Sequence, residues 1–490
     1  MKLQKITIQN FRSIDDETFN VEEVDGGNTF TLIGINESGK SSFLKAVSLV
    51  DEGEVLFPHD FFDSKSPIGV FLTYKLGQAE EKALKKALAE KGFEKDLLSK
   101  IQIEEVDVCV SFEPVVNSAR KNFDRVRFKK HIFNDYTLDG GKPVKKNPEQ
   151  TQDDFDLEKY FETYLPQYFW KISHHITFWK SANEYLINDQ IDLNAFASDQ
   201  ESTSIPLLNC FRLAGIDDEE IKAEIEKLKT NPADISDLQD KLGDKVTAHI
   251  KKVWPNHPIK IKFHIDNMML SFLVEDVGVK YDSKTTSQRS DGFRQFASFL
   301  LTVSAESSTD QLSYSLLLLD EPETHLHPQA QEYLRNELIK ITKNKENNIV
   351  LFATHSNYMI DKDRIDRCFR VLKQGNKRTK LEKIKGQDSS YSEVNYEVFH
   401  IPTSDYHNEL YGYLEDVART KLDGVPKNKK WYNDKTKATE NVSLATYIRH
   451  SIHHPENTKN NKFTAEELTR SIDTLRELKY GKKGANKNKL

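Results

Sequence analysis

Two short stretches of the sequence combine residue types that handle phosphate groups and divalent cations. The first, GINESGKS at 34–41, follows the pattern G-x-x-x-x-G-K-[ST]. In this pattern Gly34 and Gly39 let backbone N–H groups turn inward towards a phosphate, Lys40 reaches the β- and γ-phosphates of a nucleotide, and the Ser41 hydroxyl binds magnesium. A chance glycine-rich turn is the alternative. The strand expected before the loop and the helix expected after it favour the phosphate site.

The second stretch, SLLLLDEPETHLHPQ at 315–329, joins four leucines to two adjacent carboxylates. The leucine run predicts a buried strand that ends at Asp320 and Glu321. Asp320 is placed to hold magnesium through water, and Glu321 to act as general base towards an attacking water. Two exposed acids that cap the following helix are the alternative.

A further apolar run, NIVLFATHS, ends at His355. A single histidine is most often structural. Because His355 follows a second buried strand beside a nucleotide site, we favour a role in catalysis, in which it senses the γ-phosphate.

The elements that must position these residues alternate between strands and helices. Strands are expected at 2–9, 28–34, 314–320, 348–353 and 366–373, and helices at 41–51, 290–304 and 328–343. Such alternation predicts a largely parallel sheet covered by helices, which is an α/β fold. Strand-like runs between about 57 and 130 indicate an antiparallel elaboration, residues 150–256 are mostly helical in pattern, and residues 258–276 resemble a hairpin.

Length and composition limit the class of protein. The 490 residues predict two or three domains, and 30% of them are charged against 37% hydrophobic. The sequence has no apolar run near the 18 residues that a membrane span requires, and no charged-then-apolar signal at its start. We therefore expect a soluble cytoplasmic protein with no membrane partner.

These motifs resemble the ABC-type ATPase head shared by the SMC, RecF and OLD families, over about residues 1–375. The resemblance implies ATP and Mg²⁺ as cofactors, with Ser41 and Asp320 at the metal. It also implies two ATP molecules sandwiched between heads, and so a homodimer or a higher homo-oligomer. The residues that it places at the nucleotide are Arg12, Asn36, Gly39, Lys40, Ser41, Ser42 and, from the opposite subunit's signature loop, Ser290 and Gly292.

The likeness is strongest to OLD-type defence ATPases, since the sequence runs on as PETHLHP after the two acids. It divides the chain into a P-loop ABC-type ATPase head and a small α-helical C-terminal domain. The expected parts are an N-terminal lobe at 1–149, a helical insertion at 150–256, a C-terminal lobe at 257–398 and a basic helical domain at 399–490. The nuclease domain with which OLD proteins end is not expected here.

The C-terminal region carries its own candidate chemistry. Residues 401–490 contain 17 Lys and Arg and 12 Asp and Glu, although the whole chain has a net charge of −7. Arg449 and His454 fit R-x-x-x-x-H, which resembles the motif of HEPN-type ribonucleases. That resemblance implies a metal-independent attack by an RNA 2′-OH, with Arg449 stabilising charge and His454 as general acid or base. A helix C-terminus that attracts histidines is the alternative.

Three functions follow from these observations. The first is an anti-phage ATPase whose dimer gates a C-terminal ribonuclease that acts on RNA, with tRNA as the expected substrate. The second is an ATPase scaffold that regulates a separate nuclease effector protein, as in Septu-like systems. The third is a RecF-like DNA-repair ATPase, against which the acidic ATPase region speaks.

Overall fold

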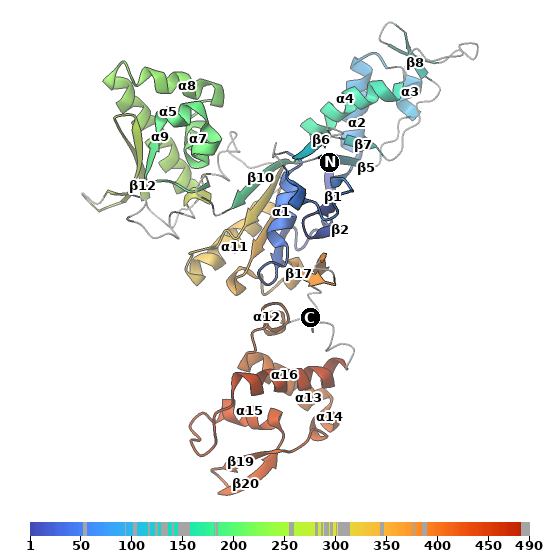
Figure 1. The fold of residues 1–490 in the computed structure, drawn as a ribbon, viewed down its shortest axis with the longest axis vertical. Helices are drawn as coiled ribbons and strands as arrows, with labels where there is room; N and C mark the ends of the chain where they lie inside the picture. Colours follow the sequence, from blue (N-terminus) through green and yellow to red (C-terminus); the bar gives the residue numbers. More distant parts are fainter. Residues whose placement is uncertain are drawn as a thin grey trace. The chain divides into compact units, whose positions relative to one another are not determined.

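The chain divides into two compact units in the computed structural model (Figure 1). The first unit contains Met1–Asp361 and Arg367–Lys383, and the second contains Lys362–Asp366 and Ile384–Leu490. The structure describes residues 1–51, 56–93, 95–100, 105–115, 118–122, 126–128, 136–139, 142–145, 157–180, 182, 185–253, 259–279, 283–285, 288, 294, 297–299, 301, 314–343, 347–375, 378–384 and 390–481.

A six-stranded sheet forms the centre of the first unit. Its strands follow the order β10 (His175–Lys180), β15 (Ser315–Asp320), β16 (Ile349–Thr354), β3 (Thr29–Ile33), β17 (Cys368–Gln374) and β18 (Arg378–Lys383). The first five strands are parallel and β18 is antiparallel to β17. The expected α/β fold with a largely parallel sheet is therefore confirmed.

Helices cover both faces of this sheet, which explains the uninterrupted apolar strands. Along β15, Leu316 and Leu318 pack into the core that contains α1 (Lys40–Ser48). The alternate residues Leu317 and Leu319 pack into a second core that contains α11 (Pro328–Lys343). Successive side chains of a strand point to opposite faces, so a strand buried on both sides is apolar at every position.

A second, antiparallel sheet lies on the α1 side and confirms the expected elaboration. Its order is β2 (Ile14–Asn20), β1 (Lys2–Phe11), β4 (Ile68–Lys75), β5 (Glu105–Val115) and β6 (Ser118–Asn122), with β7 (Val126–Phe128) also paired to β5. The helices α2 (Gln78–Glu90), α3 (Lys95–Lys100) and α4 (Leu157–Lys171) and the hairpin of β8 (Tyr136–Asp139) and β9 (Lys142–Lys145) follow in the same lobe.

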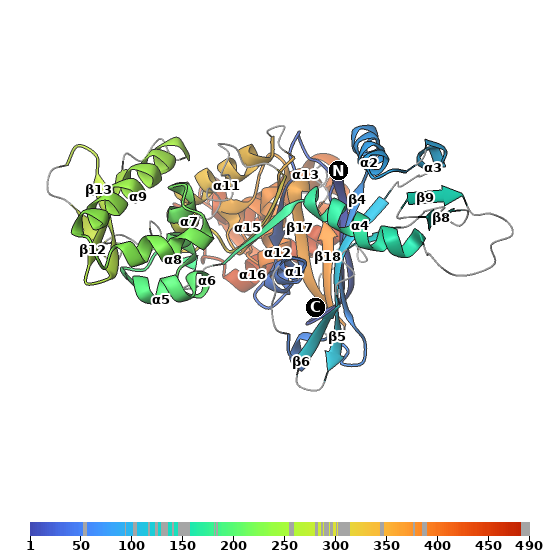
Figure 2. The same cartoon turned by 90° about the horizontal axis from the view of Figure 1, so that it is seen from above.

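The expectation of a mostly helical segment at 150–256 is wrong for His175–Lys180, which form the edge strand β10 of the central sheet. Besides α4 and the short strand at Gln190–Asp192, the described remainder of this segment contains the helices α5 (Leu193–Ser198), α6 (Gln200–Thr203), α7 (Ile205–Leu213), α8 (Asp218–Lys227) and α9 (Pro232–Val253). These helices pack with β11 (Gln190–Asp192), β12 (Ile259–Asp266), β13 (Met269–Asp276) and β14 (Lys284–Thr285). Figure 2 shows this group on one side of the central sheet and α2 to α4 on the other.

The second unit is built from helices and one hairpin. The helices are α12 (Tyr391–Phe399), α13 (Ser404–Val417), α14 (Arg419–Asp423), α15 (Leu444–His453) and α16 (Ala465–Tyr480). The hairpin of β19 (Lys429–Asn433) and β20 (Ala438–Val442) was not expected in a purely helical domain. Among the helices that the structure describes, none combines the length and apolar character needed to cross a bilayer.

Candidate active site

The glycine-rich loop at 34–41 connects the buried strand β3 to the start of α1, as the sequence predicts. Gly39 is the N-cap of α1 and has a φ angle of 109°, a backbone conformation that residues with a Cβ rarely adopt. At Gly34 a Cβ would lie 2.5 Å from the carbonyl oxygen of Val371. Glycine is therefore required at both positions, and the loop presents the positive end of a helix dipole to the space above it.

Lys40 is the first residue of α1 and is 4% exposed. Its Nζ donates hydrogen bonds to the carbonyl oxygens of Gly34 and Ile35, at 3.0 and 3.1 Å. Burial lowers the pKa of Lys40 to about 8, although the nearby carboxylates Glu321 and Asp320 oppose that shift. The ammonium group thus lies over the loop. Burial disfavours its charged form, and a phosphate bound beside it would stabilise that form.

Ser41 and Asp320 meet at the ends of α1 and β15. The Ser41 hydroxyl donates a hydrogen bond to Asp320 Oδ1 at 2.9 Å. Burial raises the pKa of the Asp320 carboxyl, and the hydrogen bond from Ser41 works against that rise. A hydroxyl and a carboxylate are the hard oxygen ligands that Mg²⁺ prefers, and Mg²⁺ sites commonly have only one or two protein ligands. The two residues therefore fit a magnesium ion.

Glu321 and His355 form the second pair at this edge of the sheet. The Glu321 backbone turns at the end of β15 with φ of 52°, and its N–H donates to Ala353 O at 3.0 Å. His355 Nε2 lies 3.0 Å from Glu321 Oε1. That contact holds the pKa of Glu321 below its usual range, so the carboxylate is ionised and able to accept a proton.

Of these residues, Lys40, Ser41, Glu321 and His355 line one cavity of about 640 Å³. Asp320 is not in that lining, but it accepts the hydrogen bond from Ser41, which is. The residues that line it are Ser13, Asn36, Glu37, Ser38, Gly39, Lys40, Ser41, Ser42, Glu321 and His355. The structure thus brings together most of the positions expected at the nucleotide. Glu37 and Ser38 were not singled out from the sequence, although they lie inside the glycine-rich loop that was.

Arg12 lies outside that lining. It has φ of 51°, and its Nε donates to Asp60 Oδ1 at 2.9 Å while the guanidinium lies 5.1 Å from the centre of the Phe11 ring. The neighbouring Ser13 lines the cavity instead. The contact of Arg12 with nucleotide stays a prediction, as do those of Ser290 and Gly292, which fall outside the described residues.

Thr379 of β18 fixes the glycine-rich loop from behind and had no signal in the sequence. Its hydroxyl donates to Ser38 O at 2.9 Å and lies 2.8 Å from the Ser13 hydroxyl. Lys373 Nζ donates a hydrogen bond to Thr379 Oγ1 at 3.2 Å. A Cβ on Gly39 would collide with the Thr379 side chain. This close packing of β18 on the loop fixes where the backbone N–H groups point.

In the second unit, Arg449 and His454 contact different neighbours. Arg449 lies 4.6 Å from the centre of the Tyr411 ring and 3.4 Å from a carboxylate oxygen of Glu415, both on α13. His454 is the C-cap of α15, and its Nδ1 lies 3.3 Å from Glu456 Oε1. Within the part of the chain that the structure describes, no hydrogen bond, ion pair or ring contact joins Arg449 to His454.

A comparison of the sequence with known families decides the class of this site. The family described as AAA ATPase domain matches residues 1–360, which include the glycine-rich loop and the Asp320, Glu321 and His355 positions. The chain belongs to this AAA ATPase family. The match ends before the helical unit, so the family assignment concerns the first unit.

Two curated relatives share part of this AAA ATPase. The Old nuclease of Escherichia phage P2 is 25% identical over 182 residues, which are 34% of this chain and 31% of that protein. The uncharacterized protein MJECL43 of Methanocaldococcus jannaschii is 27% identical over 142 residues, 27% of this chain and 35% of that protein. The chain thus spans about a third of the length of the curated relatives that it matches.

Solved structures of SMC heads also align with this AAA ATPase. An SMC head bound to the C-winged helix domain of ScpA is 12% identical with a TM-score of 0.42, over 79% of this chain and 99% of that one. The SMC head domain from Thermotoga maritima is 11% identical with a TM-score of 0.36, over 79% of this chain and 100% of that one.

Proposed function

We propose that the first unit binds and hydrolyses ATP with magnesium at the cavity above α1. The observation that carries this proposal is the meeting of two pairs at one edge of the sheet, Ser41 with Asp320 and Glu321 with His355. Magnesium, when bound, would neutralise the charge that develops on the phosphates. Ser41 and Asp320 would hold it.

The chain's own residues supply the remaining functions. Lys40 and the backbone N–H groups of the loop orient the phosphates and stabilise their charge. Glu321 accepts the proton of the attacking water, because its carboxylate is ionised and 40% exposed at the cavity. His355, hydrogen-bonded to Glu321, keeps that carboxylate in place and faces the same cavity.

Phosphate release in the presence of ATP and Mg²⁺ tests this proposal. We expect steady hydrolysis by the unaltered chain and loss of at least about 100-fold for Lys40→Ala, since a preorganised charge is removed from the transition state. Lys86→Ala is the matched control, because Lys86 is an exposed lysine of α2 and its side chain is 80% accessible. Equal rates for Lys40→Ala and Lys86→Ala would contradict the proposal.

We also propose that two heads enclose the nucleotide as a homodimer, with Ser290 and Gly292 of one subunit completing the site of the other. The support is the resemblance to ABC-type heads, whose signature loop acts across the dimer. A Glu321→Gln variant, which would bind ATP without consuming it, is expected to elute as a dimer with ATP and Mg²⁺ and as a monomer without nucleotide. A monomer in both conditions would contradict this arrangement.

For the second unit we propose that ATP turnover by the head controls a ribonuclease with Arg449 and His454 in its site. Both side chains are accessible in this net-basic unit, at 29% for Arg449 of α15 and 45% for His454 at the C-cap of that helix. Because the two residues contact different neighbours within one chain, such a site would combine Arg449 of one copy with His454 of another. The substrate class is RNA, since the attacking 2′-OH is absent from DNA.

Incubation with total tRNA distinguishes this ribonuclease from a docking platform for a separate nuclease. The ribonuclease predicts cleavage that leaves 2′,3′-cyclic phosphate ends, persists in a chelator, and is lost in Arg449→Ala and His454→Ala. Lys462→Ala is a control at an exposed residue of the same unit. Absence of cleavage in every nucleotide state, with normal ATP hydrolysis, would favour the effector-docking alternative and a search for the partner.

A further inference from the structure

The carboxyl group of Glu323 is buried directly behind the candidate active site and is not used in the mechanism above. Glu323 is 5% exposed, and its Oε1 accepts hydrogen bonds from the Thr354 hydroxyl and from the backbone N–H of His355, the latter at 3.4 Å. Its Oε2 has no hydrogen-bond partner among the described residues. Burial raises the pKa of Glu323 to about 7.

A buried carboxyl group with an unpartnered oxygen lowers the stability of the folded chain. Leaving such an acceptor without a partner costs about 1–3 kcal/mol, and a leucine of similar size would avoid the cost. Among the described residues, the hydrogen bonds to the Glu323 side chain come from the Thr354 hydroxyl at the end of β16 and from the backbone N–H of His355 immediately after it. The contacts of Glu323 therefore point to the backbone that carries the histidine of the active site.

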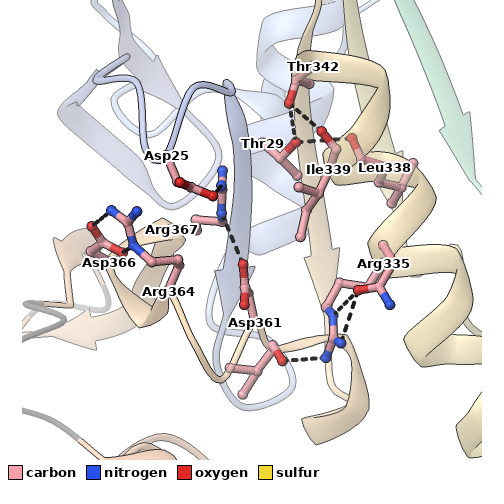
Figure 3. A network of polar contacts seen from close by, with 12 residues as sticks. Asp25, Thr29, Arg335, Leu338, Ile339, Thr342, Asp361, Arg364, Asp366 and Arg367 are labelled. Carbon is pink, nitrogen blue, oxygen red and sulfur yellow. Dashed lines mark hydrogen bonds and ion pairs between the residues drawn. The ribbon is translucent and has the colours of Figure 1, made fainter. Parts of the chain in front are cut away.

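Further hydrogen bonds hold the chain on both sides of His355. The backbone N–H of Ser356 donates to Thr354 Oγ1 at 2.9 Å, and the Ser356 hydroxyl donates to Gln331 of α11. Arg335 (labelled in Figure 3) lies one helical turn further along α11 and donates to Tyr358 O and Ile360 O at 3.0 and 2.7 Å. The segment after His355 is thus anchored to α11, and Glu323 is the anchor before it.

We propose that Glu323 is a positioning residue that fixes the backbone of Thr354 and His355, and so holds the His355 imidazole 3.0 Å from Glu321 Oε1. This inference rests on the proposed ATP hydrolysis and adds a residue to it. Glu323 is not among the residues that line the cavity. Its effect is transmitted through His355, and a misplacement of about 1 Å in a catalytic group costs as much as about 100-fold in rate.

Paired substitutions separate positioning from simple structural support. Glu323→Gln keeps a carbonyl oxygen for both hydrogen bonds, whereas Glu323→Leu removes them at similar volume. Thr354→Ser keeps the hydroxyl, whereas Thr354→Val removes it. We expect Glu323→Leu and Thr354→Val to lower kcat by about 10- to 100-fold with the Kd for ATP within about twofold, and the Gln and Ser variants to stay within about threefold of the unaltered chain.

Thr342→Val is the matched control for loss of a buried hydroxyl. Thr342 of α11 is 3% exposed, and its hydroxyl lies 2.7 Å from the Thr29 hydroxyl (Figure 3). The hydroxyl also donates to Ile339 O, and neither contact involves Thr354 or His355. This variant is expected to lose thermal stability but to retain kcat. Unchanged kcat in both Glu323→Leu and Thr354→Val, or a loss in Thr342→Val equal to that in Thr354→Val, would overturn the inference.

A spectroscopic measurement separates this inference from the proposed function. In protein labelled with ¹³C at histidine Cε1, the His355 signal is identified by its absence in His355→Gln. The inference predicts that this signal moves in Glu323→Leu and Thr354→Val and stays in Glu323→Gln, Thr354→Ser and Thr342→Val, in the absence of nucleotide. If the His355 signal stays unchanged in both Glu323→Leu and Thr354→Val, the inference is overturned, even where hydrolysis is normal. If the signals move as predicted but the unaltered chain does not hydrolyse ATP, only the proposed function is refuted.

Discussion

The Ser41 hydroxyl donates a hydrogen bond to Asp320 Oδ1 at 2.9 Å, although 279 residues separate the two in the chain. One residue belongs to the first turn of α1 and the other ends β15, so the contact joins the glycine-rich loop to the carboxyl edge of the sheet. Both groups offer oxygen ligands. A magnesium ion bound here would take the place of the Ser41 hydroxyl proton as the partner of the Asp320 carboxylate.

Removal of either oxygen should weaken the dependence of hydrolysis on magnesium. For Asp320→Asn and Ser41→Ala we expect the Mg²⁺ concentration at half-maximal rate to rise about tenfold, since one of two protein ligands is altered. The measurement is a magnesium titration of phosphate release at fixed ATP. Ser48→Ala is the control in the same helix, because the Ser48 hydroxyl donates to Lys45 O. Superimposable titration curves for all four proteins would refute the metal site.

Thr379 should set the affinity for nucleotide. Thr379→Val removes the oxygen that binds Ser38 O, the Ser13 hydroxyl and Lys373 Nζ, and it leaves the shape of the side chain nearly unchanged. Two or three lost hydrogen bonds of about 0.5–1.5 kcal/mol each predict a Kd for ATP at least about tenfold weaker. Thr379→Ser should bind normally. Fluorescent-nucleotide titration checks this, and equal Kd values for Val and Ser would show that the loop does not depend on the hydroxyl.

The second unit should lose stability in mild acid. His407 of α13 is fully buried and bonded to the Ser471 hydroxyl at 3.0 Å, and burial lowers its pKa to about 4. The unfolded chain binds this proton below about pH 6.5 and the folded chain only below about 4, so stability falls as the pH drops between these values. From pH 7 to pH 5 the loss is about 2 kcal/mol.

His407→Gln provides the test, because glutamine keeps a polar contact for Ser471 and does not titrate in this range. Urea unfolding of the full chain at both pH values, followed by fluorescence of a probe in the second unit, measures the difference. The loss between pH 7 and pH 5 should be smaller in His407→Gln by about 2 kcal/mol. An identical loss in both proteins would mean that His407 is not the titrating group.

The residues of the candidate site that the sequence predicts are those carried by local patterns. The loop at 34–41 and the acids after the leucine strand can be recognised from stretches of eight to fifteen residues. The buried strands β15 and β16 are predicted by uninterrupted apolar runs. The alternation of strands and helices then predicts a parallel sheet, whose strands end at the same edge. Asp320 and His355 lie at that edge for this reason.

What the sequence does not reveal depends on contacts between distant segments. His175–Lys180 pair with Ser315–Asp320 in the central sheet, whereas the segment that precedes them in the chain, Leu157–Lys171, is helical. Thr379 meets Ser13 across 366 residues, and Glu323 meets Thr354 through a turn whose path no local pattern specifies. The hairpin of β19 and β20 likewise lies in a polar stretch with no alternation of apolar residues.

The role of Glu321 as general base is tested most directly by single-turnover ATP hydrolysis by Glu321→Gln beside the unaltered chain, with ATP binding measured in parallel. Glu321→Gln should bind ATP in the presence of Mg²⁺ with a Kd within about threefold of the unaltered chain and hydrolyse ATP at least about 100-fold more slowly, because the proton acceptor is gone while the phosphate site is intact. Hydrolysis by Glu321→Gln at the unaltered rate would show that Glu321 is not the general base.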